Sequence, residues 1–173
     1  LLQFPADKGE PRWHAADAAA LPGLLGIDHS AIGVADSARS GRFYGDGLGL
    51  RLGGDGINQG AEQDQLDGLE GTRVRITAHR CAEGPGIECL NYQLPRGGRP
   101  MPADQGAADG AHGQIRLAVN DLEAMAAGLE AAGGRSIGSG PVTLEPALRS
   151  ALGFARALQV RDPDGHALQL VSD

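Results

Sequence analysis

Two stretches of this chain repeat one pattern of apolar and polar positions. Each begins with alternating apolar and polar residues, continues with an aspartate, and ends with an amphipathic segment that stops at glycine. Shifting the sequence by 85 positions lays His29 on Gln114 and Asp36 on Asp121. Alternation is typical of a half-buried strand, and an aspartate ahead of apolar residues with helical spacing is typical of an N-capped helix. The sequence therefore predicts an internal repeat that starts with a strand and a helix.

The rest of each half predicts further strands. In addition to the first strands at 27–34 and 112–119, a second strand is expected to start at residues 50–52, and further strands lie at 72–79, 87–94, 136–144, 154–160 and 167–171. The strand at 136–144 is weakly patterned and ends in a loop. Residues 58–70 are polar and predict a loop or short helix over the mouth of a site. The predicted order is βαβββ twice, which is an α+β fold.

The chain divides into an N-terminal arm and one domain of two modules. Residues 95–110 are rich in proline and glycine, and we expect them to link module 1 (25–94) to module 2 (111–173). Residues 1–24 form the arm. Because residues 1–4 resemble residues 168–171, two interpretations stay open: the last strand of an upstream domain plus a linker, or an ordinary arm.

Composition narrows the function classes. The net charge is −7 and aromatic residues make up 3% of the chain, so neither a basic stripe nor a stacking platform for nucleic acid is present. No apolar run is long enough to span a membrane. Cys81 and Cys89 flank a glycine-proline turn; a disulfide and a pair of free thiols both stay open, and free thiols are favoured. Cytoplasm and periplasm both stay open as locations.

Several short motifs follow one another along the chain. They are Asp28-His29-Ser30, Phe43-Tyr44, Leu48-Gly49-Leu50, Gly86-Ile87-Glu88, and Asp162-Pro163-Asp164-Gly165 before the terminal strand. With the internal repeat, they make residues 25–173 resemble the vicinal oxygen chelate superfamily of glyoxalases, bleomycin-resistance proteins and extradiol dioxygenases. The resemblance implies that the two modules form a cup-shaped mixed sheet with the helices outside.

The resemblance also implies a metal site on the first and fourth strands of each module. Carried over residue by residue, the four metal positions are His29, Glu88, Gln114 and Gln169. Imidazole nitrogen and carboxylate or amide oxygen suit Zn, Ni, Mn or Fe(II), so such a divalent metal is the expected cofactor. The fourth position is commonly glutamate in metal-dependent members, whereas the Gln169 amide is neutral and cannot take a proton.

The missing glutamate changes the expected chemistry. The role of general base falls to Glu88 or His112. An extradiol dioxygenase needs two histidines and a carboxylate, which His29, Gln114 and Gln169 do not supply. This activity is therefore disfavoured unless His112 replaces Gln114 and Glu88 provides the carboxylate.

Alternation along the first strand of each module sends Arg116 into the cup together with His29. We expect Arg116 and Tyr92 to contact the substrate, with Arg116 meeting a carboxylate or phosphate.

The other polar candidates are assigned ordinary structural roles. His79 and His166, at a strand end and a turn, are expected to be exposed. Asp162 and Asp164 favour turn chemistry over a metal-binding loop.

Three hypotheses for function follow. The first is a divalent-metal-dependent enzyme of lyase or isomerase type, in which the metal polarises an oxygen of a small anionic substrate. The second is metal-free binding of a small molecule in the cup, as in bleomycin-resistance proteins, which the glutamine-rich wall favours. The third is a structural half of a tandem-domain protein with an upstream glyoxalase-like domain. The resemblance implies pairing as a homodimer or between tandem domains.

Overall fold

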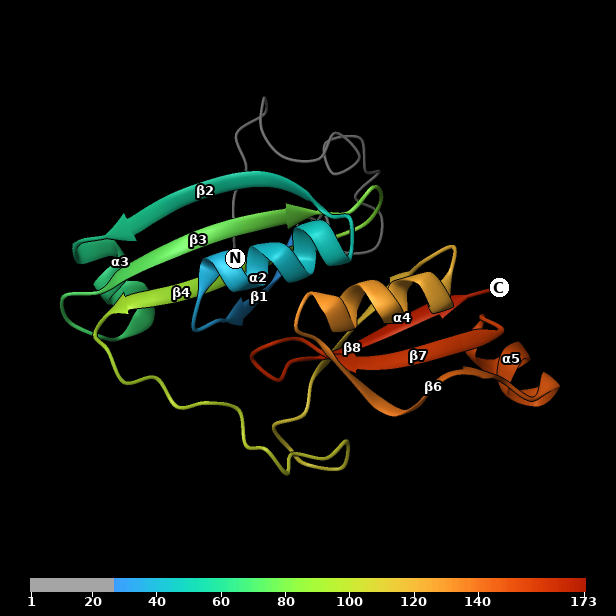
Figure 1. Ribbon diagram of the computed structural model, residues 1–173. Coiled ribbons are helices and arrows are strands. Elements are labelled where there is room, and N and C mark those ends of the chain that lie inside the picture. The colour runs from blue at the N-terminus through green and yellow to red at the C-terminus, as the bar shows by residue number, and fades with distance from the viewer. Residues whose placement is uncertain (1–26) are drawn as a thin grey trace, which may run out of the picture.

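The computed structural model describes residues 27–173, which form two four-stranded sheets, one from each half of the chain (Figure 1). The arm expected at residues 1–24 lies outside the described residues. The strand orders are β1-β4-β3-β2 and β5-β8-β7-β6, so the two sheets have the same topology. In each sheet the first strand runs parallel to the fourth, while the other neighbours are antiparallel.

The elements of module 1 follow the predicted order. They are β1 (His29–Gly33), α2 (Ser37–Gly41), the π-helical segment η1 (Arg42–Gly47), β2 (Arg51–Gln59), α3 (Ala61–Asp67), β3 (Arg73–Arg80) and β4 (Gly86–Leu94). The polar stretch predicted as a loop or short helix thus contains α3. Both cysteines are free thiols, and burial raises the pKa of Cys89 to about 12.

The elements of module 2 repeat this order with one addition. They are β5 (Gln114–Ala118), α4 (Leu122–Ala131), β6 (Arg135–Thr143), α5 (Pro146–Leu152), β7 (Arg156–Arg161) and β8 (Ala167–Ser172). The sequence did not indicate α5, because all its residues are exposed and carry no amphipathic pattern. The helix begins with Pro146 and ends at Gly153, whose φ of 77° is left-handed.

The prediction that His112 lies in the first strand of module 2 is wrong. β5 begins at Gln114, and His112 precedes it in a turn where its amide donates to the Asp109 carbonyl at 2.9 Å. The Asp109 side chain also accepts from the Gly106 amide at 2.8 Å. The backbone in front of β5 is therefore turned by local hydrogen bonds, and strand pairing starts two residues after His112.

Both predicted helix caps are confirmed. Asp36 has an extended backbone, and its carboxylate accepts from the amides of Ala38 and Arg39 at 2.8 and 2.9 Å. These amides hold the pKa of Asp36 below its ordinary value, the Arg39 amide contributing most. In module 2 the Asp121 carboxylate accepts from the Ala124 amide at 2.9 Å. The same residue type thus starts the helix in both copies of the repeat.

One hydrophobic core joins the two modules. Its buried members come from the helices and from the sheet faces beneath them: Val34, Phe43, Tyr44, Ile87, Cys89, Leu122, Leu129, Leu158, Val160, Leu168 and Leu170. The helix formed by α2 and η1 meets α4 through η1, at the junction of the two sheets (Figure 1). A Cβ at Gly134 would lie 2.5 Å from the Phe43 ring, so this approach of the modules requires glycine there.

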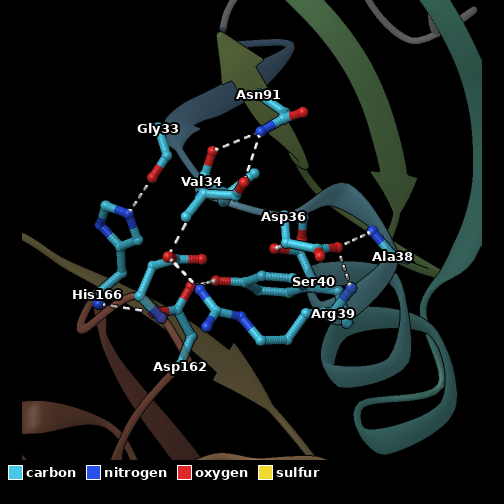
Figure 2. A network of polar contacts seen from close by, with 12 residues as sticks. Gly33, Val34, Asp36, Ala38, Arg39, Ser40, Asn91, Asp162 and His166 are labelled. Atoms are coloured by element: carbon cyan, nitrogen blue, oxygen red, sulfur yellow. Dashed lines mark hydrogen bonds and ion pairs between the residues drawn. The ribbon is translucent and has the colours of Figure 1, made fainter. Parts of the chain in front are cut away.

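A polar junction lies beside this core (Figure 2). The Tyr44 hydroxyl of module 1 donates to Oδ2 of Asp162 at 2.9 Å. Oδ1 of Asp162 accepts from the amides of Asp164 and His166 within its own turn, at 2.9 and 2.8 Å. The Asp162 side chain is 4% exposed, so these donors replace the water that the carboxylate loses.

The β7–β8 turn makes further contacts with module 1. Asp164 forms an ion pair with Arg39 and accepts from the Ala35 amide at 3.2 Å. His166 Nε2 lies 2.7 Å from the Gly33 carbonyl oxygen. The turn assignment of Asp162 and Asp164 is therefore confirmed, whereas the prediction that His166 is merely exposed is wrong. The prediction is also wrong for His79, which is 2% exposed on the helix-covered face of β3.

We predict that Tyr44→Phe lowers the free energy of unfolding by about 1–3 kcal/mol, because it leaves a buried carboxylate without one of its donors. Tyr92→Phe is the matched control, since Tyr92 also donates to an aspartate, Asp67, but is 38% exposed. Its expected effect is below about 0.5 kcal/mol. Urea unfolding of the two variants measures both values, and equal effects would contradict the role given to Asp162.

Candidate functional site

The faces of the two sheets that point away from the helices carry the polar residues predicted for the site. We call them the cup face. On β1, Ile32 packs against the core, so His29 and Ala31 lie on the cup face. On β5, Ile115 and Leu117 pack against the core, which leaves Gln114, Arg116 and Ala118 on the cup face.

The strand register places the four predicted metal positions at equivalent points. Glu88 pairs with Ala31, two residues along β1 from His29. Gln169 pairs with Arg116, two residues along β5 from Gln114. The repeat seen in the sequence is therefore a repeat of positions on the cup face. The residues differ, since Arg116 stands where module 1 has Ala31.

Module 1 brings an imidazole between two carboxylates. His29 Nδ1 lies 2.6 Å from Oδ2 of Asp28, and His29 Nε2 lies 3.2 Å from Oε2 of Glu88. The Arg80 guanidinium lies 3.4 Å from Asp28. All three members of the Asp28–His29–Glu88 cluster are half-buried, with side chains 11–22% exposed. Asp28 fixes the orientation of the ring, so that Nε2 faces Glu88 and the cup.

This cluster can hold and move a proton. An imidazole that faces a carboxylate on each side can donate through either nitrogen, and Glu88 can accept. Sequence reasoning assigned no role to Asp28. The sequence signal for Asp28 was its position directly before His29, because the side chain of the residue that precedes a strand can reach the imidazole ring of the first strand residue.

Module 2 presents a cation in place of the imidazole. Nε of Arg116 donates to Oε1 of Gln169 at 2.7 Å, and the guanidinium carbon lies 4.9 Å from the centroid of the Phe154 ring. Gln159 pairs directly with Gln169 and therefore adds a second amide to this face. Phe154 and Gln159 were not predicted as site residues. The signal for Gln159 was its alternation with the buried Leu158 and Val160.

The remaining predicted site residues do not contact His29 or Arg116 through hydrogen bonds in the described part of the chain. Tyr92 lies on β4, and its hydroxyl donates to Oδ1 of Asp67 on α3 at 3.0 Å. Burial and this hydrogen bond raise the pKa of Tyr92. Gln114 is exposed at the start of β5, and His112 lies in the turn before it.

The donor chemistry can be compared with a divalent metal site. His29 Nε2 and Glu88 Oε2 converge, and the Asp28 contact is the kind of partner that orients a metal-binding histidine. The Gln169 oxygen, however, accepts from Arg116, which also brings a positive charge to the face. Residues 27–173 contain no group of three His, Cys, Asp or Glu side chains placed to hold a metal ion. The residues fit two ligands but not a four-ligand centre.

Comparison with known proteins decides the family. The sequence profile of the Glyoxalase/Bleomycin resistance protein/Dioxygenase superfamily matches residues 26–170. The chain belongs to this superfamily. A comparison with curated proteins gives no match. Within residues 27–173, no helix combines the length and apolar character needed to cross a membrane.

Solved structures of this superfamily share the fold. A glyoxalase family protein from Bacillus cereus has a TM-score of 0.69 and 24% identity, with 88% of this chain and 97% of that chain covered. A glyoxylase/bleomycin resistance protein/dioxygenase domain from Frankia sp. has a TM-score of 0.58 and 19% identity, with 87% and 98% covered. The trypanothione-dependent glyoxalase I of Leishmania major has a TM-score of 0.52 and 20% identity, with 85% and 86% covered. At these identities the likeness concerns the fold alone.

Proposed function

We propose that this glyoxalase-superfamily protein binds a small organic anion on its cup face through Arg116, without depending on a resident divalent metal. The observation that carries the proposal is the arrangement of Arg116, which is held by Gln169 and Phe154 and makes no ion pair within residues 27–173.

The geometry leaves the binding end of Arg116 available. Its Nε donates to Gln169, so the side chain keeps its terminal nitrogens for a ligand. A guanidinium offers these N–H groups as a planar fork that matches a carboxylate or phosphate. The Phe154 ring supports the plane of the guanidinium, which lowers the loss of side-chain freedom on binding.

The neutral glutamines fit the same function. A glutamate at position 169 would form an ion pair with Arg116 and compete with an anionic ligand, whereas the Gln169 amide orients the guanidinium and leaves its charge free. The residue that departs from the metal-dependent pattern is therefore the residue that an anion site requires. The His29–Glu88 pair is the acid–base group on the cup face, so a proton transfer on a bound molecule would use it.

We predict that Arg116→Met weakens the binding of inorganic phosphate and lactate by about tenfold or more, because a charge-assisted hydrogen-bond pair is lost. Titrations followed by the backbone NMR signals of residues 114–118 and 167–171 measure the affinity. Arg135→Met is the matched control, since it removes the same charge from an exposed residue of β6. Equal weakening by both variants, or none by either, would contradict the proposal.

Restoring a glutamate at position 169 tests whether the cup face can bind a divalent metal. We predict that wild-type protein does not retain Ni or Zn at one per chain. The double variant Arg116→Ala with Gln169→Glu should bind Ni and Zn at least about tenfold more tightly than the wild type, because a carboxylate replaces an amide and a cation is removed. His29→Ala in that background should abolish the gain. Elemental analysis after gel filtration gives the ratio, and stoichiometric metal in the wild type would overturn the metal-independent assignment.

A further inference from the structure

A pocket lies on the side of the module 1 sheet (β1-β4-β3-β2) that faces the helices. Thr77 and His79 of β3 pair with Cys89 and Ile87 of β4, which belong to the core, whereas Ala78 pairs with Glu88 on the cup face. The pocket has a volume of about 410 Å³, lies between α2–η1 and β2–β3 and is open to solvent on one side. It is lined by Ser37, Gly41, Gly45, Asp46, Leu50, Leu52, Asp55, Arg75, Thr77 and His79. Strand β3 therefore separates it from the cup face.

Buried polar atoms without partners line this pocket. His79 is 2% exposed, and neither ring nitrogen has a hydrogen-bond partner among residues 27–173. The Ser37 hydroxyl is also buried and has no partner in that part of the chain. The Tyr44 ring lies 5.6 Å from the His79 ring, but its hydroxyl is already taken by Asp162. Buried polar groups in folded proteins are almost always hydrogen-bonded, so these atoms need a partner from outside the protein chain.

The charges of the pocket limit the class of ligand. Burial lowers the pKa of His79, so the ring is neutral and offers one N–H donor and one acceptor. Arg75 and Asp55 bind each other through two hydrogen bonds of 2.9 and 2.6 Å. The pocket lining therefore holds no unpaired cation for an anionic ligand. Its remaining charged residue, Asp46, is exposed, so an ion pair with it would gain little over hydration. A charged molecule would lose its hydration at the buried end without gaining an opposite charge there.

The other lining residues of the pocket suit the apolar part of a small ligand. Leu50 and Leu52 line one part, and Gly41 and Gly45 leave the helical side free of side chains. A Cβ placed on Gly41 would have no atom within 4 Å, so the space beside this helix is open. A volume of this size is within the range of small-molecule sites.

We propose that this pocket is a second ligand site, distinct from the cup face, for a small uncharged molecule with an amide or hydroxyl group on an apolar body. The polar group pairs with His79 and Ser37, and the apolar body lies against Leu50 and Leu52. The pocket lies on the helix-facing side of the module 1 sheet, whereas Arg116 lies on the cup face of the module 2 sheet, so the two ligands bind to different sheets.

Three benzene derivatives of similar size test the charge preference: benzamide, which is neutral, benzoate, which is anionic, and benzylamine, which is cationic. The His79 ring signals in NMR should shift and saturate with benzamide, while benzoate and benzylamine should bind at least about tenfold more weakly. His79→Phe removes the unpaired nitrogens but keeps a planar aromatic ring, and it should abolish benzamide binding, as read from the amide signals of residues 37–45.

Two further variants keep the test independent of any folding defect. Gly41→Leu places a side chain in open space, should leave the fold intact and should block benzamide; Gly98→Leu adds the same side chain in the linker and should have no effect. Arg116→Met should leave benzamide binding unchanged, which separates this site from the cup face. Unshifted His79 signals with all three probes, undiminished binding by Gly41→Leu, or equal binding of benzoate and benzamide would overturn the proposal.

Discussion

The buried carboxylate of Asp162 joins the two modules and thereby sets the geometry of the cup face. It accepts from the Tyr44 hydroxyl of module 1 and from two amides of the β7–β8 turn. An unpaired carboxylate at this depth would be costly, so the turn is held in the one arrangement that supplies all three donors. β8 begins directly after this turn, so the same contact fixes the position of Gln169 and, through strand pairing, of Arg116.

The two copies of the repeat share their backbone and differ in their chemistry. Equivalent points of the cup face hold His29 and Glu88 in module 1 and Gln114 and Gln169 in module 2. The first pair, oriented by Asp28, can exchange a proton. In the second half Arg116 occupies the place of Ala31 and uses the Gln169 oxygen for its own orientation. A duplicated scaffold thus combines an acid–base pair with the group that we propose to bind an anion.

The sequence predicted the fold well, because alternation and the two aspartate caps are local signals. The same alternation correctly predicted which side chains of β1 and β5 lie on the cup face. His79 was misjudged because β3 buries its more polar face: Thr77 and His79 lie beneath α2–η1, while Val74, Ile76 and Ala78 lie on the other side. The pairing of β3 with β4 decides which face of β3 the helices cover, and the residue pattern within β3 does not indicate this pairing. The Arg116–Gln169 bond likewise depends on strand register.

The most direct test of the account is a crystal structure grown with inorganic phosphate and one equivalent of nickel, with anomalous data collected at the nickel edge. The account predicts phosphate on the Arg116 guanidinium, the Gln169 oxygen still accepting from Arg116, and no nickel peak on the cup face. A nickel ion bound by His29, Glu88, Gln114 and Gln169, with Arg116 turned away, would contradict it and establish the four-residue metal site that the family resemblance implies.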